Sequence, residues 1–158
     1  VQGREIAETT LRRHYLIERL LVDLLGLNWA MVHEEANRLE HFLSPELEKH
    51  IFERLGRPTT CPQGNPFPGY LDEQMLIRAR SLAEAKPGEK VTFLRVVEEG
   101  EDDLDLMRFL LEHGLLPGSQ LVIIAPGPAT EQLLLEGPSG QVQVPVQYAR
   151  VVRVSDPH

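Results

Sequence analysis

The spacing of the apolar residues changes once along this chain, and that change limits the possible folds more than any other feature. Up to about residue 55, apolar residues recur at steps of three to five, which is typical of one face of a helix. From about residue 90 they gather in short runs of β-branched residues, which Pro-Gly and Ser-Gly turns separate. A helical half followed by a strand-rich half predicts an α+β protein with two domains.

Three helices are expected in the first half, over about 4–25, 29–42 and 45–55. Gly26 favours an end of the first helix, because glycine adopts the left-handed conformation that helix ends often need. Asn28 is expected to cap the second helix with its side-chain oxygen. Ser44 followed by Pro45 is typical of a helix start, and Gly56 suits the end of this third helix.

The second half is expected to hold five strands and one helix. A proline-rich stretch, RPTTCPQGNPFPG at 57–69, precedes it and disfavours regular secondary structure, because proline lacks a backbone donor. The expected strands cover about 90–97, 121–125, 131–137, 141–146 and 149–154, and the helix covers 103–113. Five strands in so short a segment suggest a small, partly open barrel. The predicted domains are 1–75 and 87–158, with a linker at 76–86.

Charge and composition exclude several classes of protein. The chain has 16 Lys and Arg against 24 Asp and Glu, and the resulting formal charge of −8 repels nucleic acid. No apolar run in the sequence approaches the roughly 20 residues of a membrane helix. With Cys61 as its one cysteine, the chain forms no internal disulfide, which fits a reducing compartment. We therefore expect a cytoplasmic chain that neither enters a membrane nor binds DNA by itself.

Histidines and acidic residues stand at helical spacing in two places. His14 and Glu18 are four residues apart, so both side chains lie on one face of the first expected helix. The candidates on the second expected helix, within the stretch HEEANRLEH, are His33, Asn37, Glu40 and His41. An imidazole and a carboxylate one turn apart supply half of a transition-metal site. One such pair is usually a surface ion pair worth roughly a few tenths of a kcal/mol, but the pattern on two neighbouring helices favours a shared site.

Other potential ligands are expected to lie outside the site. His50 and His113 lie on predicted helix faces without carboxylates at matching positions on a second helix, which is typical of surface residues. Cys61 stands in the proline-rich stretch with no other Cys or His two to four residues away. A zinc knuckle is therefore not expected there.

Three motifs follow one another along the chain: R-x-H-x-x-x-E-R-x-L at 12–21, V-H-E-E-A-x-R-x-E-H at 32–41 and C-P-x-G-N-P-x-P-G at 61–69. In order and separation they resemble the DtxR/IdeR/MntR family of metal-dependent transcriptional repressors. G-E-K-V at 88–91 and L-x-x-x-G-L-x-P-G-S at 110–119 resemble the SH3-like, FeoA-like barrel of that family. The resemblance covers essentially the whole chain. It implies a helical domain that dimerises and binds divalent iron or manganese, followed by a small SH3-like β-barrel.

The resemblance also implies which residues belong to two metal sites. The ancillary site would consist of His14, Glu18 and His33, with Asp103 as the candidate ligand from the barrel and Asp102 or Asp105 as alternatives. The primary, activating site would include Glu40, His41 and Asn37, the last at a position where relatives usually have Cys, Met or Glu. An amide is a neutral and weaker donor than a thiolate or a carboxylate, so the metal preference of the primary site stays open.

The resemblance further implies a homodimer that regulates transcription. The family has a winged helix-turn-helix domain ahead of the position of Val1, and we expect this chain to lack that domain. In the intact protein, contact with operator DNA is expected only through that domain. Fe2+ or Mn2+ is the expected ion in the cell, and Zn2+, Co2+ or Ni2+ could replace it. The expected dimer interface consists of Phe42, Leu43, Leu47, Ile51 and Leu55, although these residues could equally form the core of their own domain.

Two other functions have to be weighed against this one. A carboxylate-histidine metalloenzyme would need Glu-x-x-His pairs on two helices, whereas Glu40 and His41 are adjacent. A metal-free dimeric adaptor would need an aromatic groove for a proline-rich ligand, and the strand-rich half has few aromatic residues. The expected function is therefore the metal-sensing and dimerisation core of an iron- or manganese-dependent repressor, without enzyme activity.

Overall fold

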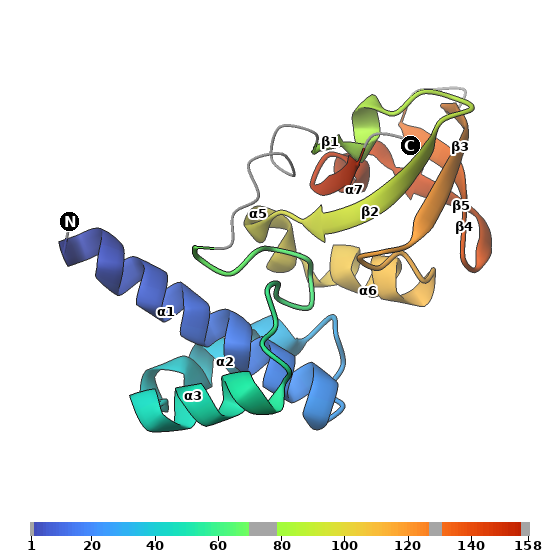
Figure 1. Cartoon of the computed structure of the whole chain (residues 1–158). Coiled ribbons are helices and arrows are strands. Elements are labelled where there is room, and N and C mark those ends of the chain that lie inside the picture. Colours follow the sequence, from blue (N-terminus) through green and yellow to red (C-terminus); the bar gives the residue numbers. More distant parts are fainter. Residues whose placement is uncertain (1, 70–78, 127–130, 156–158) are drawn as a thin grey trace. The chain divides into compact units, whose positions relative to one another are not determined.

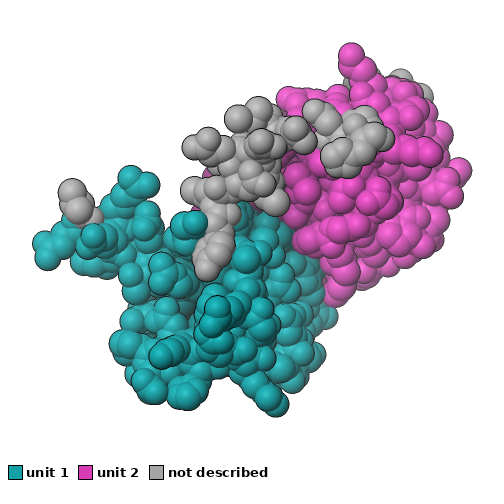
Figure 2. Space-filling model, viewed as in Figure 1, with its two compact units in different colours: residues 1–71 teal, residues 72–158 magenta. Residues whose placement is uncertain are grey.

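The computed structural model describes residues 2–69, 79–126 and 131–155. They belong to two compact units, residues 1–71 and residues 72–158 (Figure 2). The first unit is helical and the second is built on an antiparallel sheet, which confirms the expected α+β class with two domains (Figure 1). Within the described part of the chain, no helix is both long and apolar enough to cross a membrane.

The described residues of the helical unit form α-helices joined by short helices of other types. In chain order these are α1 (Gln2–Arg19), the π-helix η1 (Leu20–Leu24), α2 (Val32–Leu39), the 3-10 helix η2 (Glu40–Phe42) and α3 (Pro45–Arg54). Gly26 follows η1 with a φ of 69°, as its predicted role at a helix end requires. The side chain of Ser44 accepts a hydrogen bond from the backbone amide of Leu47, which confirms the predicted start of α3.

The second helix begins later than the sequence predicts. α2 starts at Val32, and Asn28 does not occupy its N-cap position. Asn28 instead accepts a hydrogen bond from the backbone amide two residues further on, within the turn that precedes the helix. The reason is tertiary, because the buried Trp29 donates from Nε1 to the carbonyl oxygen of Pro62 at 2.8 Å and holds this turn against the proline-rich loop. The predicted cap is therefore wrong.

The core of the helical unit forms where its helices meet the proline-rich loop. Its buried members are Tyr15, Leu16, Ile17, Leu21, Val32, Ala36, Leu43, Ile51, Cys61 and Phe67. The stretch 57–69 is thus an ordered part of this unit, with Cys61 and Phe67 fully buried. Arg19 holds the loop in place, because its guanidinium donates to the backbone and hydroxyl oxygens of Thr60 at 2.7 and 2.9 Å.

The described strands of the second unit form one antiparallel sheet in the order β1-β6-β2-β3-β4-β5. In chain order its elements are β1 (Arg80–Ser81), the 3-10 helix η3 (Leu82–Glu84), β2 (Lys90–Val96), α5 (Glu98–Glu101), α6 (Leu104–Glu112), β3 (Gln120–Pro126), β4 (Gln132–Gly137), β5 (Gly140–Pro145), α7 (Val146–Ala149) and β6 (Val152–Ser155). Alternate strand residues are buried, as Val91 and Phe93 of β2 are, so one face of the sheet carries the core of this unit. The order leaves β1 and β5 at the edges, which agrees with a partly open barrel.

Two parts of this unit differ from the prediction. β1 pairs with β6 through Arg80 and Val154, so it belongs to the sheet although it lies in the expected linker, 76–86. β6 begins at Val152, because residues 146–149 form α7. A strand of two residues and a helix of one turn are too short to produce a periodic pattern in the sequence. Their places depend on partners that are remote along the chain.

Candidate metal centre

The helices α1 and α2 place three candidate ligands at one point of the helical unit. His14 and Glu18 lie one turn apart on α1, and His33 lies in the first turn of α2. All residues from 14 to 18 are buried, so protein surrounds α1 at this height. His14 is 5% exposed and Glu18 is 0% exposed. The pair is therefore not the surface ion pair that its spacing alone would also allow.

The ligand atoms of these three side chains converge. Nε2 of His14 lies 2.9 Å from Nδ1 of His33 and 3.1 Å from Oε1 of Glu18, and Nδ1 of His33 lies 3.8 Å from Oε2 of Glu18. Ligands that each stand about 2.1 Å from one ion are separated from each other by roughly 3–3.5 Å. Among the described residues, this is the one group of three or more His, Cys, Asp or Glu side chains with ligand atoms within 4.8 Å of one another.

The carboxylate of Glu18 favours a cation at this point. Neither of its oxygens has a hydrogen bond of good geometry to any described residue, although the side chain is fully buried. Its neighbours are the imidazoles of His14 and His33, which offset the cost of burying this charge when a ring carries an extra proton, and a bound cation would offset the cost in the same way. Two imidazole nitrogens and one carboxylate suit a divalent transition metal, whereas Ca2+ and Mg2+ prefer oxygen ligands alone. The residues present thus fit a transition-metal ion.

Burial and proximity change the pKa values of His14 and Glu18 in opposite directions. Burial, the largest influence, lowers the pKa of His14, but the carboxylates of Glu18 and Glu40 outweigh it and raise this pKa above its usual 6.5. Burial raises the pKa of Glu18, but the imidazoles of His14 and His33 outweigh it and leave this pKa below its usual 4.5. A proton on His14 therefore stabilises the metal-free site, and it competes with a metal ion for the same ring.

Glu40 of η2 contacts His14 at its other ring nitrogen. Oε2 of Glu40 lies 2.6 Å from Nδ1 of His14, and Oε1 lies 3.5 Å from Nε2 of His41. The structure thus places Glu40 beside a residue of the expected ancillary site, although the resemblance assigns it to the primary site. The sequence contains a signal for this position, because Glu40 follows His33 by seven residues, about two helical turns, and so shares its face.

The other residues expected in the primary site, Asn37 and His41, are exposed. The side chain of His41 is 71% exposed, and within the described chain it belongs to no converging group of three His, Cys, Asp or Glu ligands. The role of Asn37, Glu40 and His41 as ligands of one ion therefore stays a prediction.

Asp103, the ligand expected from the second unit, has a local role there. It occupies the N-cap position of α6, and its Oδ1 accepts a hydrogen bond from the backbone amide of Leu106 at 3.1 Å. The alternatives Asp102 and Asp105 are exposed. Whether any of these three aspartates binds a metal stays a prediction, and the cap gives Asp103 a structural function that sequence spacing alone did not suggest.

The remaining histidines and the cysteine have other surroundings. His50 is exposed and its Nε2 lies 3.1 Å from a carboxylate oxygen of Glu46. His113 is half-buried, and its Nδ1 donates to the carbonyl oxygen of Phe109 at 2.8 Å. Cys61 lies in the core. None of these three belongs to a converging group of three or more His, Cys, Asp or Glu ligands in the described ranges.

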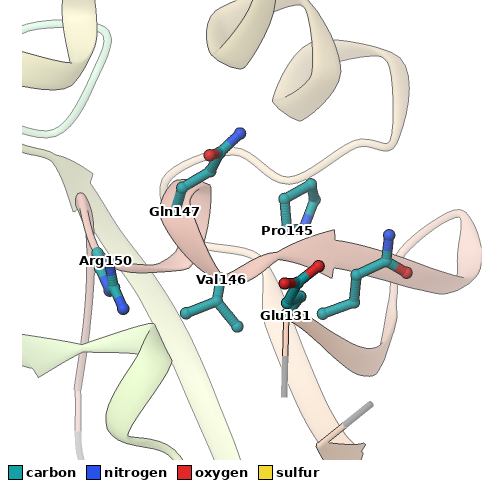
Figure 3. A pocket seen from close by; sticks show the side chains of 6 residues that line it. Glu131, Pro145, Val146, Gln147 and Arg150 are labelled. Carbon is teal, nitrogen blue, oxygen red and sulfur yellow. The ribbon is translucent and has the colours of Figure 1, made fainter. Parts of the chain in front are cut away.

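The second unit has a surface pocket of a different character. Its volume is about 530 Å³, and it is lined by Glu131, Gln132, Pro145, Val146, Gln147 and Arg150. In Figure 3, Glu131 and Arg150 lie on either side of Val146. One carboxylate accompanied by an arginine and two glutamines is not a set of metal donors. This pocket is therefore not a second metal centre.

Comparisons with known proteins agree with this division of the chain. Residues 1–69 match the family model described as the metal binding and dimerisation domain of iron dependent repressors, and residues 80–156 match the FeoA domain. A helical unit with a His-Glu-His group of converging ligand atoms, joined to a FeoA domain, defines the class of metal-binding regulators. The chain belongs to the DtxR/IdeR family of iron-dependent repressors.

Individual relatives show how far the similarity extends. The iron-dependent repressor IdeR of Mycobacterium leprae (strain TN) is 35% identical over 163 residues, which cover 97% of this chain and 70% of that protein. The diphtheria toxin repressor of Corynebacterium glutamicum is 46% identical over 131 residues, which cover 78% of this chain and 57% of that protein. These relatives are repressors and not enzymes, which excludes the metalloenzyme alternative at the level of the family.

Solved structures agree with the fold of the whole chain. A manganese-dependent transcriptional repressor in complex with manganese has a TM-score of 0.84 and 29% identity, covering 98% of this chain and 72% of that chain. ScaR with bound Zn2+ has a TM-score of 0.75 and 26% identity, covering 96% of this chain and 73% of that chain. The family therefore includes proteins that bind divalent transition metals.

Proposed function

We propose that this chain is the metal-sensing and dimerisation core of an iron- or manganese-dependent transcriptional repressor that controls metal homeostasis. The observation that carries the proposal is the convergence of His14 Nε2, His33 Nδ1 and the buried Glu18 carboxylate within 4.8 Å. Fe2+ or Mn2+ is the proposed ion in the cell, because the relatives named above include an iron-dependent and a manganese-dependent repressor. Imidazole ligands suit Fe2+, and the carboxylate of Glu18 also suits Mn2+. Zn2+, Co2+ and Ni2+ should bind the same three ligands.

The position of the ligands suggests how metal could act on the helical unit. His14 and Glu18 come from α1 and His33 comes from α2. An ion bound to all three residues would therefore favour conformations in which these two helices stay together. In the whole regulator, metal binding and operator binding are then coupled: bound metal increases the affinity for DNA, and bound DNA increases the affinity for metal. Asn37, Glu40 and His41 remain our candidates for a second site, and Asp103 remains our candidate ligand from the second unit.

The proposed partners are a second copy of the chain and, for the whole regulator, operator DNA. A chain with a formal charge of −8 is poorly suited to hold DNA itself, so we assign the operator contact to a domain other than the two described. We also propose a cytoplasmic location, because a regulator of this kind acts on DNA. The matched dimerisation domain supports the homodimer.

The dimer interface is proposed at the exposed apolar side chains that follow α2. Phe42 is 85% exposed and Leu47 is 49% exposed, so both apolar side chains are available for contact with a second copy. Leu43 and Ile51 are buried within the unit, and Leu55 packs against the same core. Of the five residues expected at the interface, Phe42 and Leu47 are therefore the ones through which two copies would meet, and the other three support them from within.

Calorimetric titration of the metal-free protein with Mn2+, and anaerobically with Fe2+, tests the proposal. Binding should disappear in a His14→Ala, His33→Ala double variant, because two of three ligands are lost. His50→Ala is the matched control, since His50 is exposed and lies beside Glu46, and it should bind like the original protein. Equal binding by the double variant, or none by the original protein, would contradict the assigned site. A sizing column run on the same samples reports the dimer.

A further inference from the structure

We infer that Glu40 is a positioning residue of the metal centre: its carboxylate holds the Nδ1–H of His14 and so presents the Nε2 lone pair of that ring to the ion. This inference rests on the proposed metal-binding function and concerns how one ligand is prepared for it. This role involves Oε2 of Glu40 and comes in addition to the place in a second site that the family resemblance implies for Glu40.

The contact between Glu40 and His14 is short and shielded. Oε2 of Glu40 lies 2.6 Å from Nδ1 of His14, and the two side chains are only 11% and 6% exposed. Glu40 belongs to η2 and His14 to α1, so tertiary packing, and not local spacing, brings them together. A hydrogen bond to a charged acceptor is about twice as strong as a neutral one. Shielding from water further increases its effect on the ring.

The direction of this hydrogen bond determines which ring nitrogen is available. A neutral imidazole carries one proton, and a carboxylate oxygen can only accept, so the nitrogen beside Glu40 is the protonated one. The lone pair then lies on Nε2 of His14, which is the atom beside Glu18 and His33. The two nitrogens of a ring point in different directions, so a carboxylate bound at Nδ1 does not occupy the position of an ion at Nε2.

Glu40 is needed because Glu18 favours the opposite tautomer in the absence of metal. Oε1 of Glu18 lies 3.1 Å from Nε2 of His14, close enough to attract the proton of the ring to that nitrogen. A ring protonated at Nε2 has no lone pair for an ion there. Two carboxylates therefore compete for one proton, and the shorter contact, at 2.6 Å, belongs to Glu40. Outer carboxylates that fix metal-binding histidines in this way are common in metal sites.

Nuclear magnetic resonance of the metal-free protein at alkaline pH, where the ring is neutral, tests this inference directly. Long-range proton-nitrogen correlations of histidine side chains labelled with nitrogen-15 identify the protonated nitrogen of His14. The original protein should show Nδ1–H. Glu40→Ala should shift the population toward Nε2–H, whereas Glu40→Gln should keep Nδ1–H, because the amide oxygen still accepts. Glu46→Ala, which removes the carboxylate beside the exposed His50, is the matched control and should leave His14 unchanged.

Metal affinity gives a second readout. Glu40→Ala should weaken Mn2+ binding about 10- to 100-fold, the usual effect of losing an outer partner of a metal ligand, and Glu40→Gln should weaken it less. An Nε2–H tautomer in the original protein would overturn the inference, and this measurement does not depend on any variant that folds. An unchanged Nδ1–H tautomer in Glu40→Ala would also overturn it. A tautomer shift in a protein that binds no metal would support the role of Glu40 while refuting the proposed function.

Discussion

Nε2 of His14 and Nδ1 of His33 lie 2.9 Å apart, although 19 positions separate the two histidines along the chain. Two imidazolium ions at this distance would repel each other, so the space between these two nitrogens holds either one shared proton or one metal ion. The adjacent buried carboxylate of Glu18 favours a positive charge in both cases. This relationship is the basis of the predictions on metal binding and pH.

Replacing Glu18 by Gln should remove the stabilisation that metal gives. At a free metal concentration of 100 times Kd, a single site raises the free energy of unfolding by about 2.7 kcal/mol, and Glu18→Gln should lose most of this increase. Thermal unfolding with and without Mn2+ measures the difference. Glu53→Gln, at an exposed ion pair with Arg57, is the control and should keep the full increase. A full increase in Glu18→Gln would show that the carboxylate is not a ligand.

The metal-free protein should be most stable between about pH 4.5 and 6.5. The pKa of His14 is raised by folding, so its contribution is complete below the unfolded value of 6.5 and is lost as pH rises through the raised value. The pKa of Glu18 is lowered, so its contribution is complete above 4.5 and is lost as pH falls through the lowered value.

Metal should reverse the alkaline part of this profile, because protons and metal compete for His14. Unfolding midpoints measured from pH 6.5 upward, with a chelator or with Mn2+, test the prediction. The midpoint should fall with rising pH in the chelator and rise in Mn2+, and a His14→Ala variant should flatten both changes. A metal-free midpoint that rises through this range would contradict the assigned pKa direction.

Phe42→Glu should dissociate the dimer while leaving the fold of each copy intact. The side chain is 85% exposed, so a charge there costs the isolated unit little, whereas two buried glutamates would face each other or an apolar partner at a two-fold interface. Sedimentation equilibrium should show at least a tenfold weaker dimer, a change of roughly 1.4 kcal/mol. Ile6→Glu, another exposed apolar position, is the control, and equal effects of both substitutions would argue against a specific interface.

Arg19→Ala should destabilise the helical unit by about 1.5–3 kcal/mol, which is typical for hydrogen bonds that involve a charged group. Arg19 donates to the backbone oxygens of Thr60 and Cys61 and so attaches the proline-rich loop to α1. Urea unfolding measures the loss. Arg38→Ala removes only exposed ion pairs, and it should change stability by less than about 0.5 kcal/mol. Similar losses in both variants would mean that the loop is not held by Arg19.

Asp103 substitutions should separate its cap from its predicted role as a ligand. Asp103→Ala should cost about 1 kcal/mol, because the side chain caps α6, whereas Asp103→Ser should keep most of the cap. If Asp103 is a metal ligand, both variants should bind Mn2+ more weakly than Glu112→Ala, which removes an exposed carboxylate at the other end of α6. Unchanged affinity in Asp103→Ser would restrict Asp103 to its structural role.

Local sequence signals were sufficient where the relevant contacts are local. The cap at Ser44 and the left-handed Gly26 involve only residues within one turn of each other, so their positions follow from the sequence. The Asn28 cap failed because Trp29 binds the carbonyl of Pro62, which lies 33 positions away. Strand β1 was missed for the same reason, since its ladder joins it to β6, more than 70 positions further along the chain.

The candidate ligands show the same division. The sequence by itself determined that His14 and Glu18 share a face of one helix and that His33 lies on the next, because helical periodicity is a property of neighbouring residues. Only the tertiary structure decided that Glu40 turns to His14 while His41 turns outward, because the chain changes from α2 to the 3-10 helix η2 at Glu40. Helical spacing indicates that Glu40 shares the face of His33, but the contact with Nδ1 of His14 depends on how α1 packs against that face, which periodicity along one helix does not describe.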